Sequence, residues 1–543
     1  MSSASEPRKK AGQTVAGAGL IVMASIMLSR VLGLVRDAVI ASQFGTTVLT
    51  DAYTISFRVP DLIFYLVAGG AFSSALIPVF SEYLSKDDED GAWKTFSVVA
   101  TIMGTLVVLL VTAMFLAADA ITPILAVDKP KEIFDEVSLM GRILLPAQIF
   151  FLFGSLSFAT LYSKKEFTVP GLGPNLYNIC IILGAIFISH WVNPSVAGMC
   201  WGALIGAFLG NVLVPLWAMR RVGMKFSFSY DFRHPGALKV FKLMLPVIFG
   251  LSLPQVLAFF NNWLSNHYGA GTNTAMDYAN KLQQAPIAIF GMSMALAAFP
   301  TLSEFWAKSE LKLFTAQFTR TLTTTAYLCL PIAAMMVAVP DEIIRIVFER
   351  NNFTAASTAL TAPLLQALAI GILGWSLAPV VMRGFYATQQ TIVPIVIGTG
   401  ATVVFIGGGL AVKYSGQPAF VLALVGSITG ILLVGALLVA LKRRVSDLEF
   451  GPIFTSLFKT LLASAVFGAL MWAGVFGFHQ LGEPGGFVGR LLSFSLCFII
   501  AGWGYYLASR GLKMPEAATI ERAAAKLNRG KKNEPESTDE AGS

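Results

Sequence analysis

Apolar stretches long enough to cross a lipid bilayer recur along almost the whole of this 543-residue chain. A membrane helix needs about 20 apolar residues to cross the hydrocarbon core. Hydrophobic residues make up 55% of the chain and charged residues only 13%, with a mean hydropathy of +0.69. That composition excludes an ordinary water-soluble protein. The pattern therefore predicts an all-α polytopic membrane protein.

Hydropathy along the chain predicts about fourteen transmembrane helices. Their expected limits are 16–42, 53–83, 96–121, 138–162, 172–191, 197–219, 240–265, 275–303, 319–340, 357–385, 391–412, 417–441, 455–479 and 488–508. Lysine and arginine concentrate at one set of loops and ends, which the positive-inside rule assigns to the cytoplasm. We therefore expect both termini in the cytoplasm, with a tail at 1–15 and a second tail at 509–543 that is disordered at its end.

An internal repeat relates the two halves of the chain at an offset of 222 to 226 residues. Matched positions include Gly69 with Gly291, Pro78 with Pro300, Glu82 with Glu304, and Asp51 with Asp277. The repeat predicts an N-lobe of helices 1–6 at 16–221 and a C-lobe of helices 7–12 at 240–444. Because the offset is an even number of spans, an axis along the membrane normal would relate the lobes, with a cavity between them and alternating access as the mechanism. The last two helices, 455–508, lie outside the repeat.

Two arginines, Arg30 and Arg36, lie inside the first apolar span. A charged residue in the middle of a membrane helix costs about 2.5 to 3.5 kcal/mol, so it usually faces a polar cavity or a partner. Asp37 lies within about 20° of Arg30 around the helix, which predicts that it orients Arg30, and Ser29 precedes them. These residues indicate a path for an anion. The structural alternative is that Arg36 and Asp37 snorkel to the interface and Arg30 pairs with a neighbouring helix.

Helices one, two, seven and eight are the equivalent pairs that would face each other, and further polar residues fall in the second, seventh and eighth. Asp51 begins the second helix and Arg58 lies about two turns further in. In the eighth helix, Lys281 and Gln284 precede Pro286. A helix cap, a structural ion pair and snorkelling remain the alternatives for Asp51, Arg58 and Lys281. In the seventh helix, Gln255 and Asn261 could equally serve helix packing.

Several of these segments resemble the MurJ (MviN) lipid II flippases of bacteria. The resemblance covers roughly residues 16–445 and is carried by Ser29–Asp37, by Phe44-Gly45 to Asp51-Ala52, and by Gly69 through Pro78 to Glu82. It continues through Phe167–Asn178, Pro246–Asn261, Tyr278–Glu304 and Phe385–Pro394.

The resemblance implies a fold of the multidrug/oligosaccharidyl-lipid/polysaccharide exporter superfamily, with two lobes around a cationic cavity. It implies that helices 13 and 14 form a groove for a polyprenyl tail. Arg30, Arg36, Asp51 and Lys281 fall where the family has functionally important charged residues. The implied cargo is undecaprenyl-pyrophosphate carrying a disaccharide-pentapeptide, moved from the cytoplasmic to the outer leaflet of the bacterial inner membrane. Membrane lipids and cell-wall synthesis proteins are the implied partners.

The residues themselves agree with such a cargo, because a pyrophosphate needs several cationic donors and arginine offers a planar fork. The chain departs from several relatives at Phe64 and Tyr65, where they have arginines. The span 391–412 offers no carboxylate or amide, so sodium coupling is not expected. We expect no cofactor, with the membrane potential or an ion gradient as the driving force.

Two other functions remain open from the residues. The same fold could export another polyprenyl-linked oligosaccharide or a drug, and a membrane glycosyltransferase would need catalytic carboxylates in an outer loop. Enzyme motifs and the spacing of metal ligands are missing, since the four histidines are widely separated. A basic stretch with stacking aromatics is also missing, so nucleic acid is not an expected partner. We therefore predict a transporter, with neither a catalytic nor a metal site.

Overall fold

The computed structural model describes residues 15–67, 71–166, 168–482 and 486–517. Within these ranges, the side chains of residues 15–24, 26, 66, 67, 71–74 and 246–256 are not described. The expected N-terminal tail, the expected disorder at the end of the C-terminal tail, and the glycine pair at 69 and 70 lie outside the described residues.

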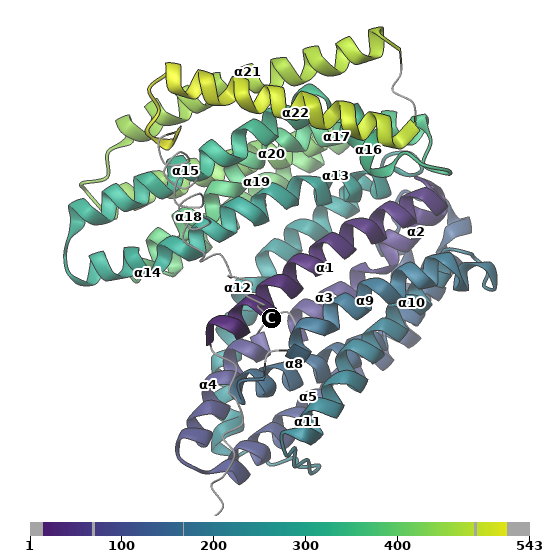
Figure 1. Ribbon diagram of the computed structural model, residues 1–543. Coiled ribbons are helices and arrows are strands. Elements are labelled where there is room, and N and C mark those ends of the chain that lie inside the picture. Colours follow the sequence, from purple (N-terminus) through teal and green to yellow (C-terminus); the bar gives the residue numbers. More distant parts are fainter. Residues whose placement is uncertain (1–14, 68–70, 167, 483–485, 518–543) are drawn as a thin grey trace, which may run out of the picture. The chain divides into compact units, whose positions relative to one another are not determined.

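All regular elements of the described chain are helices, which confirms the all-α fold class (Figure 1). Unit 1 comprises the described residues up to Ala275 together with Phe348–Ser357. Its helices are α1 (Val15–Phe44), α2 (Val48–Ser56), α3 (Arg58–Val67), α4 (Ala71–Ser85), α5 (Glu89–Leu116), α6 (Ala118–Leu125), η1 (Lys131–Ile133), α7 (Phe134–Leu144), α8 (Ala147–Ser163), α9 (Thr168–Ile186), η2 (Ile188–His190), α10 (Ala197–Phe208), η3 (Leu209–Leu213), α11 (Val214–Arg221) and α12 (Pro235–Ser265).

Unit 2 comprises Met276–Val347 and the described residues from Thr358 onward. The chain enters it within α13 (Thr272–Pro286), leaves it at the end of α16 (Pro340–Phe348), and returns within α17 (Ala355–Ile370). Its other helices are η4 (Ile287–Met292), α14 (Ser293–Ala307), α15 (Leu311–Ala338), α18 (Ile372–Ala387), α19 (Ile392–Tyr414), α20 (Ala419–Arg444), α21 (Phe450–Gln480) and α22 (Gly486–Gly511). The predicted lobes, 16–221 and 240–444, follow the sequence repeat and stay a prediction.

Ten helical segments of the described chain are long and apolar enough to cross a membrane, or eleven if the bent pair α17–α18 is one span. They are Glu89–Leu116, Lys131–Ser163, Thr168–His190, Ala197–Arg221, Thr272–Ala307, Leu311–Ala338, Ile392–Tyr414, Ala419–Arg444, Phe450–Gln480 and Gly486–Gly511. The expected count of fourteen is not confirmed. Helices α1 and α12, with 30 and 31 residues, are not among the ten, and only part of their side chains are described.

The expected second span, 53–83, is interrupted between α2 and α3, while residues 68–70, between α3 and α4, lie outside the described residues. α2 ends at its C-cap Phe57, and α3 begins directly at Arg58. Pro60 is the third residue of α3, where its missing backbone N–H costs no helical hydrogen bond. The helix boundary therefore lies at Phe57, three residues before the proline.

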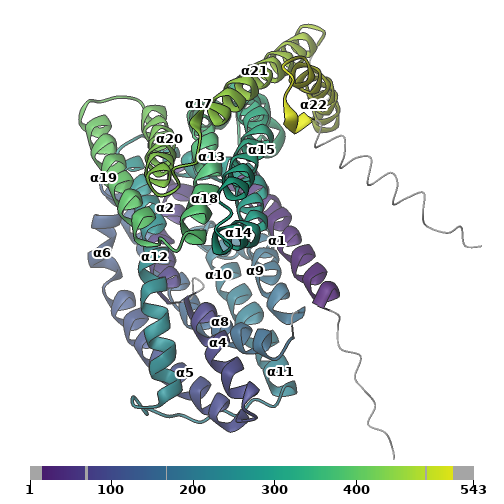
Figure 2. The ribbon, with the colours of Figure 1, turned by 90° about the vertical axis from the view of Figure 1, so that its left-hand side faces the viewer.

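Each unit has its own apolar core. In unit 1, α4 packs against α8 and α12, around Phe80, Trp93 and Phe96. Figure 2 shows α9 and α10 side by side in this unit, and these helices are also in contact. In unit 2, α18 packs against α14, α15 and α20, around Phe318 and Phe385. α21 lies along α15, and α22 lies along α21 (Figure 1).

The helix bounds of the two halves follow the sequence repeat. α4 ends at Ser85 and α14 at Ala307, while α5 begins at Glu89 and α15 at Leu311, and α5 and α15 each have 28 residues. At the ends of α4 and α14, matched glutamates form the same ion pair one turn apart, Glu82–Lys86 at 2.9 Å and Glu304–Lys308 at 2.5 Å. The repeat is therefore structural as well as sequential.

The segment Phe348–Ser357 joins unit 1 although its neighbours in sequence belong to unit 2. The backbone N–H of Asn352 donates to Ser42 O at 3.0 Å. Gly45 has φ of +62°, and a Cβ there would lie 2.4 Å from Asn352 O. Only glycine suits that position, because both the backbone conformation and the close approach exclude a side chain.

Candidate functional site

Arg36 is the centre of a polar cluster between α1 and α9 in unit 1. Its guanidinium donates to Asp37 Oδ1 at 3.0 and 3.1 Å and to Asn178 Oδ1 at 2.9 Å. Asn178 in turn donates to Ser29 O at 3.3 Å and to Ser29 Oγ at 3.4 Å. Asp37 is only 3% exposed. The cluster holds an arginine inside the span with hydrogen bonds on two sides, as a charge removed from water requires.

Arg30 has a different environment from Arg36. Its side chain is exposed, and it makes no hydrogen bond or ion pair with the described residues. We expected Asp37 to orient Arg30, but Asp37 instead pairs with Arg36. The expectation rested only on the angle between residues around the helix axis. The Arg36 side chain is long enough to fold back onto the adjacent residue, Asp37.

Asp51 is fully buried at the start of α2 and accepts four hydrogen bonds within unit 1. Lys129 Nζ donates to Oδ2 at 2.8 Å and Gly271 N at 2.8 Å, while Thr274 donates to Oδ1 through N at 3.0 Å and through Oγ1 at 2.9 Å. All of its usual acceptor positions are therefore occupied. Asp51 fixes the loop before α7, the loop before α13 and the first turn of α13 to one point.

Arg58 is the first residue of α3 and is half-buried. On the same helix, the Phe64 ring contacts Tyr65 with centroids 5.4 Å apart and Phe151 of α8 at 5.1 Å. Phe151 continues to Tyr177 of α9 at 5.5 Å. Aromatic packing thus surrounds Phe64, and Arg58 is the cation of α3.

Lys281 lies in unit 2, on α13. Its Nζ is 2.8 Å from Asp277 Oδ2 and 5.6 Å from the centre of the Tyr278 ring. Both charged side chains of the pair are about one-third exposed, at 32% and 33%. Gln283, which was not among the expected site residues, donates to Leu368 O at 2.6 Å, whereas the expected Gln284 is exposed.

The polar residues expected on the seventh helix contribute less to this picture. Asn261 on α12 is half-buried, and its carbonyl accepts from Ser265 Oγ at 2.7 Å, which is a contact within the helix. Gln255 lies in the part of α12 whose side chains the structure does not describe. Their roles stay a prediction.

Several residues of these clusters were missed from the sequence, among them Lys129, Thr274 and Asn178. Lys129 lies in a loop of mixed charge, and its partner Asp51 is 78 residues away in sequence, so no local pattern pairs them. Asn178 ends the Phe167–Asn178 segment that carries the family resemblance, and that position was a usable signal. Across the described part of the chain, no three histidine, cysteine, aspartate or glutamate side chains gather as a metal site would require.

The chain is similar to several known proteins. The family model "Lipid II flippase MurJ" matches residues 40–493. The lipid II flippase MurJ of Burkholderia cenocepacia is 28% identical over 391 residues, covering 71% of this chain and 76% of its own. The probable lipid II flippase MurJ of Haemophilus influenzae is 28% identical over 467 residues, covering 82% and 90%.

Solved structures show the same fold. An inward closed conformation of the lipid II flippase MurJ matches with a TM-score of 0.73 and 22% identity, over 91% of this chain and 99% of that one. An inward-facing multidrug resistance transporter of the MATE family, in the MOP superfamily, matches with a TM-score of 0.66 and 14% identity, over 80% and 99%. The family model covers more than half of the residues, so this multi-span membrane protein belongs to the MurJ lipid II flippase family, a family of transporters rather than enzymes.

Proposed function

We propose that this chain moves lipid II, the undecaprenyl-pyrophosphate-linked disaccharide-pentapeptide, from the cytoplasmic to the outer leaflet of the bacterial inner membrane. A charged saccharide head group cannot cross hydrocarbon unaided. A cationic path that opens to one side at a time lowers that barrier without covalent chemistry.

The observation that carries this proposal is the pair of arginines on α1. Arg36 is fixed in position by Asp37 and Asn178, whereas the exposed Arg30 makes no hydrogen bond to the described residues. A fixed cation orients an anionic group, and a mobile cation can follow that group as it moves. Both are suited to a pyrophosphate, which accepts bidentate hydrogen bonds from guanidinium groups.

The other charged residues divide between binding and support. We assign Arg58 and Lys281 to the cargo path, because they place cations in the second and eighth expected helices, which the repeat matches with each other and which we expect beside the cavity. Ser29, Gln255, Asn261 and Gln284 would serve as supporting polar groups on that path.

For Asp51 we propose a change of role. Its four hydrogen bonds leave no acceptor for cargo, so it holds the start of α13 at the end of unit 1 that we expect to face outward. Breaking and reforming those bonds would accompany alternating access.

The driving force and surroundings complete the proposal. We propose that the membrane potential or an ion gradient drives the cycle and that both termini are cytoplasmic. Proteins of cell-wall synthesis would supply and consume the cargo. The spans offer no Walker lysine, so ATP is not expected to act on this chain.

The test is replacement of the native flippase in a bacterium depleted of it. Outer-leaflet lipid II would be measured with a protein that degrades only exposed lipid II. The chain should restore exposure and growth. Failure with normal expression and membrane insertion would overturn the proposed function.

A matched pair of variants links that test to the site. Arg30→Ala should abolish transport while expression stays normal. Lys413→Ala removes a cation from the last turn of α19, away from the proposed path, and should transport like the parent chain.

A further inference from the structure

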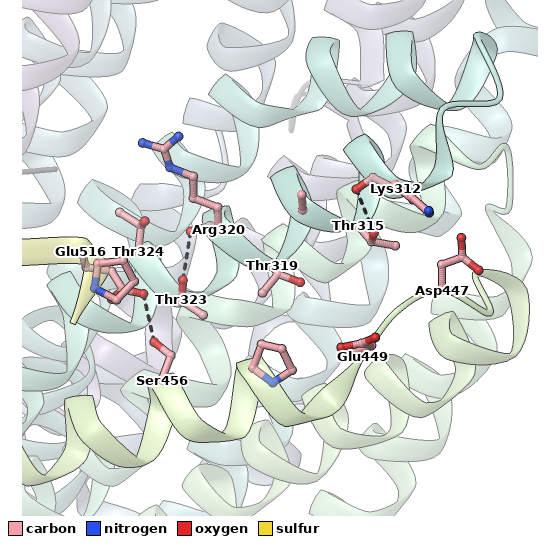
Figure 3. A pocket seen from close by; sticks show the side chains of 13 residues that line it. Lys312, Thr315, Thr319, Arg320, Thr323, Thr324, Asp447, Glu449, Ser456 and Glu516 are labelled. Atoms are coloured by element: carbon pink, nitrogen blue, oxygen red, sulfur yellow. Dashed lines mark hydrogen bonds between the residues drawn. The ribbon is translucent and has the colours of Figure 1, made fainter. Parts of the chain in front are cut away.

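A pocket in unit 2 lies between α15, the start of α21 and the segment after α22, outside the proposed cargo path. Its volume is about 880 Å³. Its charged and hydroxyl lining residues are Lys312, Thr315, Thr319, Arg320, Thr323, Thr324, Asp447, Glu449, Ser456 and Glu516. Figure 3 shows Lys312 and Asp447 at one end of this pocket, and Ser456 and Glu516 at the other. The lining thus combines both signs of charge with hydroxyl groups, which does not suit an apolar lipid tail.

The repeat reveals what occupies the corresponding place in unit 1. At the offset of 222 residues, Thr319 and Thr323 of α15 correspond to Ser97 and Thr101 of α5. In unit 1 these two hydroxyl groups are buried under the connection between α11 and α12. Backbone N–H groups of that connection donate to them, from Ser227 to Ser97 Oγ at 3.2 Å and from Ser229 to Thr101 Oγ1 at 3.3 Å.

The covering segment of unit 1 also brings charges of both signs to α5. Lys225 pairs with Asp90 at 2.6 Å, and this hydrogen bond raises the pKa of Lys225. Asp231 lies 3.9 Å from Lys94. The face of α5 is therefore covered by a segment that offers N–H donors, one cation and one anion.

Unit 2 lacks such a covering segment because its connection is shorter. The chain passes from α11 to α12 through residues 222–234, but from α20 to α21 through residues 445–449. α21 has already begun at Phe450, so a helix rather than an extended segment packs along α15 beside Thr319 and the buried Thr323. The equivalent face of α15 lines the open pocket instead.

Charges in the pocket do not neutralise one another. Among the described residues, Lys312, Arg320 and Glu449 have no hydrogen bond or ion pair through their charged groups. Glu516 is only 6% exposed; one carboxylate oxygen accepts from Ser456 Oγ at 2.9 Å, and the other has no partner in the described part of the chain. A buried carboxylate with an unused acceptor calls for a further donor.

We propose that this pocket binds the head group of a zwitterionic membrane lipid that carries a primary amine, as phosphoethanolamine does. The ammonium group lies at the end of the pocket that holds Glu516 and supplies the donor that its second carboxylate oxygen lacks. The phosphate faces Arg320 and the hydroxyl groups of α15, since hydrogen bonds to phosphate from cationic donors are the strong ones.

The position of the pocket favours a lipid over a soluble zwitterion. α15 and α21 both qualify as membrane spans. Beside the pocket, α21 exposes Phe454 and Phe458 at 64% and 62%, so its outer face is apolar at the same turns. Lys442, Arg443 and Arg444 end α20 nearby, which places the pocket at the expected cytoplasmic interface.

Lipid binding to the purified full chain tests the proposal. Native mass spectrometry would compare phosphatidylethanolamine, phosphatidylcholine and phosphatidylglycerol with identical acyl chains. Phosphatidylethanolamine should bind best, and Glu516→Gln should weaken its binding by about tenfold, as expected for the loss of one charge-assisted hydrogen bond. Equal binding of phosphatidylcholine would overturn the role of the N–H donors, and equal binding of phosphatidylglycerol would overturn the role of the amine.

Two further variants keep the test decisive. Arg320→Gln alters an exposed side chain and should also weaken phosphatidylethanolamine, even if Glu516→Gln fails to fold. Glu310→Gln removes an exposed acid just before α15 that does not line the pocket, and it should bind like the parent chain. Equal weakening by Glu310→Gln would show a general charge effect and overturn the site.

A soluble competitor distinguishes the two possible sources of the head group. Glycerophosphoethanolamine should fail to displace the lipid, which assigns the site to the membrane. Displacement at millimolar concentration would retain the head-group chemistry but overturn the assignment to a membrane lipid.

Discussion

The two aspartates that the repeat matches, Asp51 and Asp277, have opposite environments. Asp51 is fully buried and accepts four hydrogen bonds from three segments of unit 1. Asp277 is one-third exposed and pairs with Lys281 one turn along α13. Duplication placed the same residue in both halves, and only one copy became a structural anchor. A matched position therefore does not imply a matched role.

The sharpest way to break this comparison is to remove each carboxylate in turn. Asp51→Ala leaves Lys129 buried without its partner, so we expect a loss of about 3 to 5 kcal/mol of stability. Asp277→Ala should cost about 1 kcal/mol or less, because its pair is partly in solvent. Unfolding of the purified proteins in mixed detergent would measure both. Equal losses of stability would show that the two aspartates have the same structural role.

The two arginines of α1 extend the comparison within one helix. Arg36→Ala removes three hydrogen bonds to Asp37 and Asn178, and should cost about 1.5 to 3 kcal/mol of stability as well as transport. Arg30→Ala should lose transport with unchanged stability. Thermal unfolding and outer-leaflet lipid II would be measured on the same preparations. A destabilised Arg30→Ala would contradict the assignment of Arg30 to cargo.

Variants of Lys281 test whether unit 2 contributes to transport through the positive charge of this residue or only through the packing of its side chain. Lys281→Arg keeps the cation and should retain most transport, whereas Lys281→Gln should lose it. Both should change stability by less than about 1 kcal/mol, since the pair with Asp277 is partly exposed. Initial transport rates in proteoliposomes would measure the difference. Full transport by Lys281→Gln would remove Lys281 from the cargo path.

The smallest expected effect concerns the hydroxyl groups of α5 and α15. Ser97→Ala should cost about 1 kcal/mol, because the Ser227 N–H loses its acceptor. Thr319→Ala lines the open pocket and should leave stability near that of the parent chain in lipid-free detergent. Chemical denaturation would resolve the two. An equal cost for Thr319 would mean that its face of α15 is already covered.

The sequence predicted the fold class and the repeat because both depend on local patterns. Apolar stretches of span length predicted the helices. Matched glycines, prolines and glutamates predicted that α4 and α14 are equivalent in the two halves. The charged residues of α1 were also found, because an arginine in an apolar span stands out.

Contacts distant in sequence could not be predicted in the same way. Asp51 meets Gly271 and Thr274 across more than 200 residues, through backbone N–H groups that no sequence pattern marks. The pairing of Asp37 with Arg36 depends on side-chain conformation rather than helical angle. Neither a proline nor a glycine lies at the helix break at Phe57, so the hydropathy pattern predicted one continuous span there.

The segment Phe348–Ser357 has a consequence for how the chain is made. Unit 1 acquires its last ten residues only after α13 to α16 have been synthesised. When the nascent chain has been synthesised only as far as Ala275, unit 1 therefore still lacks the Asn352 N–H that donates to the Ser42 carbonyl. The two units cannot mature strictly in sequence order, and a fragment ending at Ala275 would be an incomplete unit rather than a separable half.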